Sequence, residues 1–84
     1  IEKINYSNFN IYPNPNNGYF EIKVTNPNLY TEIEIFNLTG KKIYKKIITN
    51  DENYINLNKF NSGLYLVNAR QNGKLTTKKL QILK

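Results

Sequence analysis

Any catalysis by this chain would have to use carboxylate, lysine, tyrosine or serine side chains, because it contains no histidine and no cysteine. Glu32 and Glu34 come closest to a reactive pair: two residues apart on a strand, they project from one face, as paired carboxylates do in glycoside hydrolysis. They alternate with Ile33 and Ile35, however, which is typical of a strand with one solvent-facing side. We therefore interpret both carboxylates as solvated surface groups.

Metal and phosphate chemistry find little support in the sequence. Without histidine and cysteine, the two commonest soft metal ligands are missing. Asp51-Glu52 could bind calcium weakly, but such a site needs several further oxygen ligands, so we interpret the pair as part of a turn. The four glycines stand far apart at expected strand junctions, which argues against a phosphate-binding loop. We expect a chain that is not an enzyme and holds no cofactor or metal.

Positive charge and aromatic rings leave binding functions open. Twelve Lys and Arg against six Asp and Glu give a net charge of +6, which would suit nucleic acid or anionic lipid. The lysines cluster where strand edges usually carry them, and most rings fall at expected core positions, so nucleic acid is not an expected partner. We assign Phe20, Phe60 and Tyr65 to packing. A carbohydrate-binding or adhesion module would need exposed rings on one face, and the candidates for these are Tyr19, Tyr30 and Tyr44.

The elements that must position these side chains are β-strands. At 84 residues the chain is one small domain, and a domain of this size buries only about 60% of its unfolded surface. Apolar residues alternate with polar ones in seven segments, separated by turn signals at the spacing of an all-β sandwich. These segments are 9–12, 20–24, 32–35, 42–44, 54–57, 64–70 and 75–83. We predict an Ig-like β-sandwich of about seven antiparallel strands.

Turn residues mark the connections between these strands. Asn37 to Gly40 resembles a type I turn closed by a left-handed glycine, and Asn72-Gly73 is the strongest hairpin signal. Residues 26–28 and 50–53 break other strands, and residues 58–61 form a single 3₁₀ turn at most. Tyr12-Pro13-Asn14-Pro15-Asn16-Asn17-Gly18 combines two prolines with a glycine in a rigid turn that begins a strand.

The first residues differ from the rest. Residues 1–8 lack clean alternation and fit the end of a linker from an upstream domain, and the absence of methionine indicates a fragment or a processed piece. No run approaches the roughly 20 apolar residues of a membrane-spanning helix, and the amino end lacks the basic-then-apolar layout of a secretory signal peptide. If the parent protein is secreted, we expect that signal upstream of residue 1. The sequons at 5–7 and 37–39 we interpret as coincidence in an asparagine-rich chain.

Taken in order, the motifs resemble the type A C-terminal sorting domain of the type IX (Por) secretion system. The likeness runs from about residue 9 to residue 84. The residues that match the family's first, turn and third motifs are Pro13, Asn14, Pro15, Gly18, Phe20, Gly40, Lys41, Gly63 and Tyr65. The lysine-flanked tail with Lys79, Leu80, Ile82 and Lys84 matches the terminal motif.

The resemblance implies an Ig-like domain at the carboxy end of a secreted cargo protein. The cargo would reach the periplasm by general export, and the type IX outer-membrane translocon would then recognise the folded domain. A sortase-like peptidase would remove it, leaving the cargo free or joined to anionic lipopolysaccharide at the cell surface. The sequence leaves open whether the isolated domain is a monomer or an edge-paired dimer.

We expect the proline and glycine motifs to set backbone geometry and the terminal strand to be the surface that is read. The expected mechanism is strand addition to an exposed edge, with lysines discouraging unwanted pairing. The residues expected to take part in translocon recognition are Lys78, Lys79, Leu80, Ile82, Leu83 and Lys84.

Overall fold

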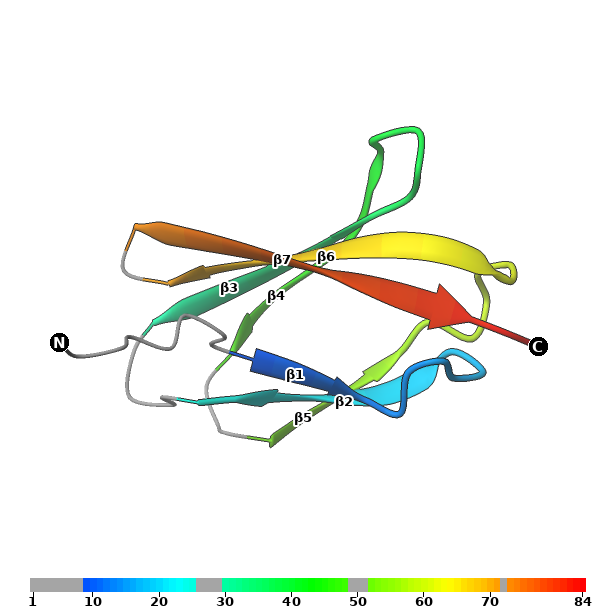
Figure 1. Ribbon diagram of the computed structural model, residues 1–84, viewed down its shortest axis with the longest axis horizontal. Helices are drawn as coiled ribbons and strands as arrows, with labels where there is room; N and C mark the ends of the chain where they lie inside the picture. The colour runs from blue at the N-terminus through cyan, green and yellow to red at the C-terminus, as the bar shows by residue number, and fades with distance from the viewer. Residues whose placement is uncertain (1–8, 26–29, 49–51, 72) are drawn as a thin grey trace, which may run out of the picture.

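The structure is a computed structural model that describes residues 9–25, 30–48, 52–71 and 73–84. The described residues form a β-sandwich of seven strands in two antiparallel sheets (Figure 1), which confirms the predicted Ig-like architecture. The strands are β1 Phe9–Tyr12, β2 Tyr19–Val24, β3 Thr31–Phe36, β4 Lys42–Ile48, β5 Glu52–Asn56, β6 Gly63–Gln71 and β7 Lys74–Ile82. The predicted linker, the sequon at 5–7 and the break at 26–28 lie outside the described residues, as does Asp51.

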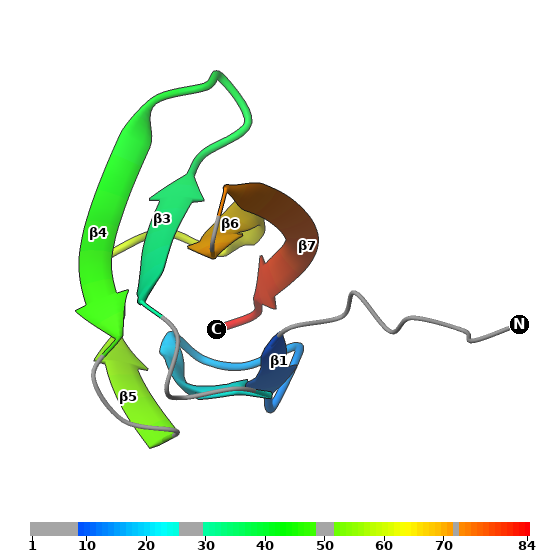
Figure 2. The ribbon, with the colours of Figure 1, turned by 90° about the vertical axis from the view of Figure 1, so that its left-hand side faces the viewer.

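One sheet has the order β1-β2-β5 and the other the order β4-β3-β6-β7. Seen end-on in Figure 2, the two sheets face each other, and β7 curves from the four-stranded sheet towards β1 and β2. Strand β7 is therefore at the edge of its sheet, but its last residues approach the opposite sheet. The end of β7 therefore lies beside the connection between β1 and β2 (Figure 1).

The core follows directly from the alternation in the sequence, because successive side chains of a strand point to opposite faces of its sheet. Along β2, for example, Phe20, Ile22 and Val24 point inward and are buried, whereas Tyr19 and Lys23 are exposed. Each such large side chain stabilises the fold by about 1.5–3 kcal/mol when fully buried. The core side chains are Phe9, Phe20, Ile22, Val24, Ile33, Ile35, Ile48, Ile55, Leu57, Tyr65, Val67, Ala69, Leu80 and Ile82.

Tyr65 fixes the corner at which the chain passes from one sheet to the other. Its ring is buried near the start of β6, and its hydroxyl donates to the carbonyl of Asn61 at 2.7 Å. A buried tyrosine whose hydroxyl bonds to backbone a few residues upstream is a recurring corner in Ig-like domains. Phe60 packs against the same core. The assignment of Phe20, Phe60 and Tyr65 to packing is therefore confirmed.

The turns follow the sequence signals where the structure describes them. The N–H of Gly40 donates to the Asn37 carbonyl at 3.0 Å and Gly40 has φ +91°, so the expected turn is present and its glycine is left-handed. Gln71 pairs with Lys74, so β6 and β7 are joined by a two-residue connection, as expected of the Asn72-Gly73 signal. Near residue 58 a single turn is closed by the bond from Phe60 N–H to the Leu57 carbonyl.

Candidate functional site

The first sequence motif forms a loop between β1 and β2, residues 13–17, which we call the edge loop. Asn16 organises it from within: its side-chain nitrogen donates to the Pro13 carbonyl at 2.8 Å, and its side-chain oxygen accepts from the Gly18 N–H at 2.8 Å. Asn16 is buried, although it is polar, because these bonds satisfy its side chain. Both X–Pro peptide bonds of the loop are cis.

The edge loop is bonded along the outer edge of β7. The side chain of Asn14 donates to the Lys79 carbonyl at 2.9 Å and accepts from the Gln81 N–H at 2.9 Å. The backbone of Asn16 continues the pairing, donating to the Gln81 carbonyl at 3.0 Å and accepting from the Leu83 N–H at 2.7 Å. Residues 65 positions apart in the sequence thus close one side of the sandwich. The first motif caps the edge of the terminal strand.

Gly18 carries the chain from this loop into β2 and touches the turn that follows β5. Its carbonyl accepts from the Leu57 N–H at 2.7 Å. Gly18 has φ +108°, and a Cβ placed on it would lie 2.7 Å from the Cα of Asn58. Only glycine permits both this backbone conformation and this close approach.

The terminal strand presents two different faces. Leu80 and Ile82 are fully buried in the core, whereas Lys79, Gln81 and Leu83 are exposed. In the folded domain the side chains of Leu80 and Ile82 therefore face the core and not the surface. Of the other terminal residues, Lys78 is partly buried with its ammonium 5.7 Å from the centroid of the Phe9 ring, and Lys84 donates from its side chain to the Asn58 carbonyl and from its N–H to Ser62 Oγ at 2.9 Å.

The remaining motif residues lie at turns. Gly63 pairs with Ile82 at the start of β6, so the third motif meets the terminal strand directly. Lys41 is exposed beside the β3–β4 turn, and its N–H donates to the side-chain oxygen of Asn37 at 2.9 Å. The first, third and terminal motifs therefore meet at one end of the sandwich, where Figure 1 shows the β1–β2 connection beside the end of β7.

The model of the secretion system C-terminal sorting domain family matches residues 10–83 of this chain. The chain belongs to this family. It is thus a C-terminal sorting domain of type IX secretion, a family of signals and not a type of enzyme, whose cargo is secreted or placed on the outer-membrane surface. A comparison with curated proteins gives no match.

Within the described residues of the sorting domain, no helix is long and apolar enough to cross a membrane. The same residues contain no group of three or more acidic, histidine or cysteine side chains arranged to hold a metal ion.

The two carboxylates of β3 are paired with lysines of β4. Glu34 lies 2.8 Å from the ammonium of Lys42, and Glu32 lies 3.6 Å from that of Lys45. The hydrogen bond from Lys42 holds the pKa of the Glu34 carboxyl below its ordinary value, against a smaller opposing effect of burial. Glu32 and Glu34 do share the outer face of β3, as predicted. The β4 residues directly opposite them are Ile47 and Lys45, and each carboxylate forms its ion pair with a lysine that lies diagonally across on the same strand.

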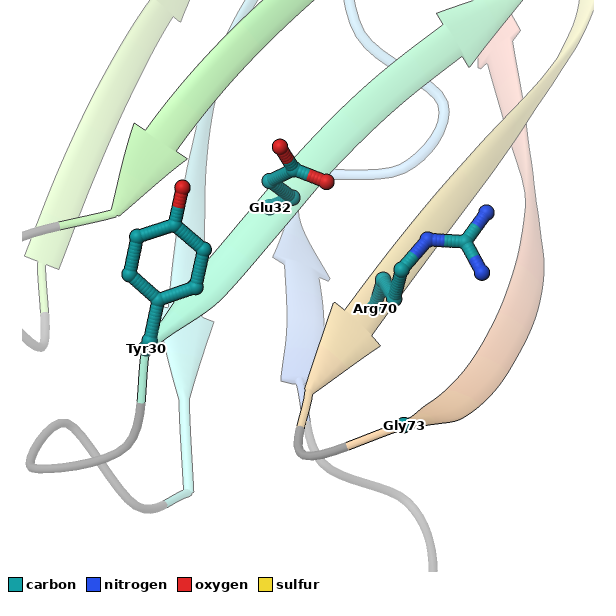
Figure 3. A pocket seen from close by; sticks show the side chains of 4 residues that line it. All are labelled: Tyr30, Glu32, Arg70 and Gly73. Atoms are coloured by element: carbon teal, nitrogen blue, oxygen red, sulfur yellow. The ribbon is translucent and has the colours of Figure 1, made fainter.

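The three rings considered for carbohydrate binding are not brought together. Tyr19 is exposed on the three-stranded sheet, whereas Tyr44 is partly buried against the core from β4. Tyr30 precedes β3 and lines a hollow of about 320 Å³ with Glu32, Arg70 and Gly73 (Figure 3). A flat platform made of these three rings therefore does not exist.

Removing the Asn14 side chain tests the bonding between loop and terminal strand. We expect Asn14→Ala to lower the free energy of unfolding by about 1–2 kcal/mol, because two hydrogen bonds across the edge are lost. The Gln81 amide should also exchange faster with solvent. Urea unfolding and amide exchange measure the two effects.

The matched control is Asn17→Ala in the same loop, since Asn17 accepts only locally, from the Tyr19 N–H at 3.2 Å. It should change stability less and leave Gln81 exchange as it is. Equal effects of the two variants would show that the hydrogen bonds from Asn14 to β7 do not contribute to the free energy of unfolding.

Proposed function

We propose that this sorting domain directs a larger cargo protein, joined before it in the same chain, through the type IX outer-membrane translocon. Residues 9–84 would form the sorting domain and residues 1–8 the end of the linker from the cargo. After general export to the periplasm, the translocon would recognise the folded domain, and a sortase-like peptidase would remove it at the cell surface. Membership of the sorting-domain family supports the signalling role.

The observation that carries this proposal is the convergence of motifs at one end of the fold. The edge loop is bonded to β7, and Gly63 pairs with Ile82 at the end of β7. Residues that a translocon could contact at this end are exposed: we define the terminal surface as Lys79, Gln81, Leu83 and Lys84. It combines two cationic side chains with an exposed leucine, a composition that suits recognition by a partly apolar, acidic partner.

Strand addition beside the last residues of β7 would compete with the edge loop. The backbone groups that an added strand would need at Gln81 and Leu83 already bond to Asn14 and Asn16. We therefore propose that the terminal surface is read by its side chains while the loop stays in place. Leu80 and Ile82 contribute from within the core by holding this strand in position.

A fusion experiment tests the proposed function. The 84-residue chain is joined to the carboxy end of a reporter that carries a general export signal, in a bacterium that has type IX secretion. We expect the reporter at the cell surface or in the medium, and we expect a fusion lacking residues 80–84 to remain in the periplasm. A reporter that stays in the periplasm with the complete chain, or leaves it with the truncated one, would contradict the proposal. Binding of the chain to polysaccharide in a pull-down, without export, would instead favour a carbohydrate-binding or adhesion module.

A further inference from the structure

Three exposed tyrosines surround one glutamate on the outer face of the three-stranded sheet. In the strand register Glu21 of β2 lies directly between Tyr12 of β1 and Tyr54 of β5. Tyr19 lies two residues before Glu21 on β2 and so projects from the same face. Directly opposed side chains on one face of an antiparallel pair lie about 4.5–5.5 Å apart at Cβ, close enough to act on one ligand. We call this group the tyrosine cage.

The cage borders a hollow of about 270 Å³, which is lined by Tyr12, Pro13, Tyr19, Phe20, Glu21 and Tyr54. The three tyrosine rings are 74%, 50% and 71% exposed at positions 12, 19 and 54, so they stand at the surface around the carboxylate. A core strand with a solvent-facing side does not require three large rings there. Each strand of the three-stranded sheet contributes one of these exposed tyrosines.

The Glu21 carboxylate at the centre of the cage has one oxygen that accepts no hydrogen bond from the described residues. Oε2 of Glu21 is buried and has no hydrogen-bond partner among the described residues. Lys23, the next residue on the same face of β2, does not donate to it. A buried acceptor without a donor is unfavourable, and more so when it is charged. A ligand that supplies a donor relieves this cost once the Glu21 side chain turns Oε2 towards the hollow that Glu21 lines.

We propose that the tyrosine cage binds an arginine side chain of a partner protein. Its charge complements Glu21, and N–H groups of a guanidinium form the strong, charge-assisted hydrogen bonds that a carboxylate prefers. The same planar cation is attracted to tyrosine rings and stacks on them. A neutral ligand such as a glycan would bring donors but leave the carboxylate charge uncompensated. The proposal depends on the cage alone and requires no assumption about export.

Peptide titration followed by amide chemical shifts of the 84-residue chain tests the proposal. The probes are Ac-Gly-Arg-Gly-NH₂, the same peptide with citrulline, and the same peptide with lysine. Citrulline has nearly the shape of arginine, but it carries no charge, and a carbonyl oxygen replaces one of the N–H-bearing nitrogens of arginine. We expect the arginine peptide to shift amides of β1, β2 and β5 around Glu21 and to bind about tenfold more tightly than the citrulline peptide. The lysine peptide should bind more weakly than the arginine peptide, because an ammonium does not stack on the rings.

Variants with matched controls locate the site. Glu21→Gln keeps the shape and should weaken arginine binding about tenfold, and Tyr54→Thr, which keeps a strand-forming residue, should weaken it about threefold or more. Tyr30→Thr removes a similarly exposed tyrosine that precedes β3, away from the cage, and should leave binding unchanged. Unchanged shifts elsewhere in the spectrum show that each variant is folded.

Four outcomes of the peptide titrations would overturn the proposal. These are equal affinities of the arginine and citrulline peptides, equal affinities of the arginine and lysine peptides, unchanged binding by Glu21→Gln, and absence of shifts around Glu21. Oligosaccharide that shifts the cage amides while the arginine peptide does not would also overturn it, and would identify the cage as a glycan site.

Discussion

Replacing Gly18 by alanine is expected to lower the free energy of unfolding by about 3 kcal/mol or more, which is a large part of the stability of a small domain. An alanine at φ +108° is strained by about 1–2 kcal/mol before any contact is considered. Its Cβ would also lie 2.7 Å from the Cα and 3.0 Å from the N of Asn58, and backbone atoms cannot rotate aside as a long side chain can. The edge loop and the turn at Asn58 would have to separate.

The control for this prediction is Gly40→Ala in the β3–β4 turn. Gly40 has a similar φ of +91°, but a Cβ there would meet nothing within 4 Å. It should therefore show the backbone strain alone, about 1 kcal/mol. Urea unfolding of the two variants separates strain from collision. Similar losses at both positions would mean that the approach of Gly18 to Asn58 does not constrain the fold.

Leu80→Ala is expected to cost about 2–5 kcal/mol of folding free energy. Leu80 is fully buried, and it occupies the terminal strand next to the bonds made by Asn14. The smaller side chain loses apolar burial and leaves a cavity that the surrounding core fills only in part. We expect the urea midpoint to fall steeply and β7 amides to lose protection from hydrogen exchange.

The control is Leu83→Ala, three residues later. Leu83 is 54% exposed, so its truncation should change stability by about 0.5 kcal/mol or less. If Leu83→Ala destabilised the domain as much as Leu80→Ala, the division of the terminal strand into a buried and an exposed face would be wrong. The pair also shows why loss of export by a truncated tail cannot by itself identify a recognition surface, since removing residues 80–84 removes core side chains as well.

The strands and turns could be predicted because their signals are local. Alternation at Phe20, Ile22 and Val24 fixes which face of β2 is inward, and the glycine at position 40 reports a left-handed turn. The same local rule predicted the solvent-facing position of Glu32 and Glu34. Their lysine partners across the β3–β4 pair depend on register, which the turn between the strands sets.

The bonding of the edge loop to the terminal strand could not be predicted in this way. Asn14 and Gln81 are 67 residues apart, and an asparagine in a proline-rich loop carries no mark of a distant partner. From the sequence, the first motif and the terminal motif were therefore interpreted as separate features, one for backbone shape and one for recognition. In the structure the loop formed by the first motif is hydrogen-bonded to the edge of the terminal strand. Likewise, Tyr12, Glu21 and Tyr54 come together only through the pairing of three strands.

The most direct test of this account is the export of a reporter fused to a variant whose terminal surface is changed and whose fold is not. In Lys79→Glu/Leu83→Ser both side chains are exposed, so the free energy of unfolding should match that of the unaltered chain. The control Leu38→Ser/Lys41→Glu makes the same two changes at exposed positions of the β3–β4 turn. We predict that the first fusion accumulates in the periplasm and that the control is exported. Normal export of a stable Lys79→Glu/Leu83→Ser fusion would contradict the claim that the terminal surface is what the translocon reads.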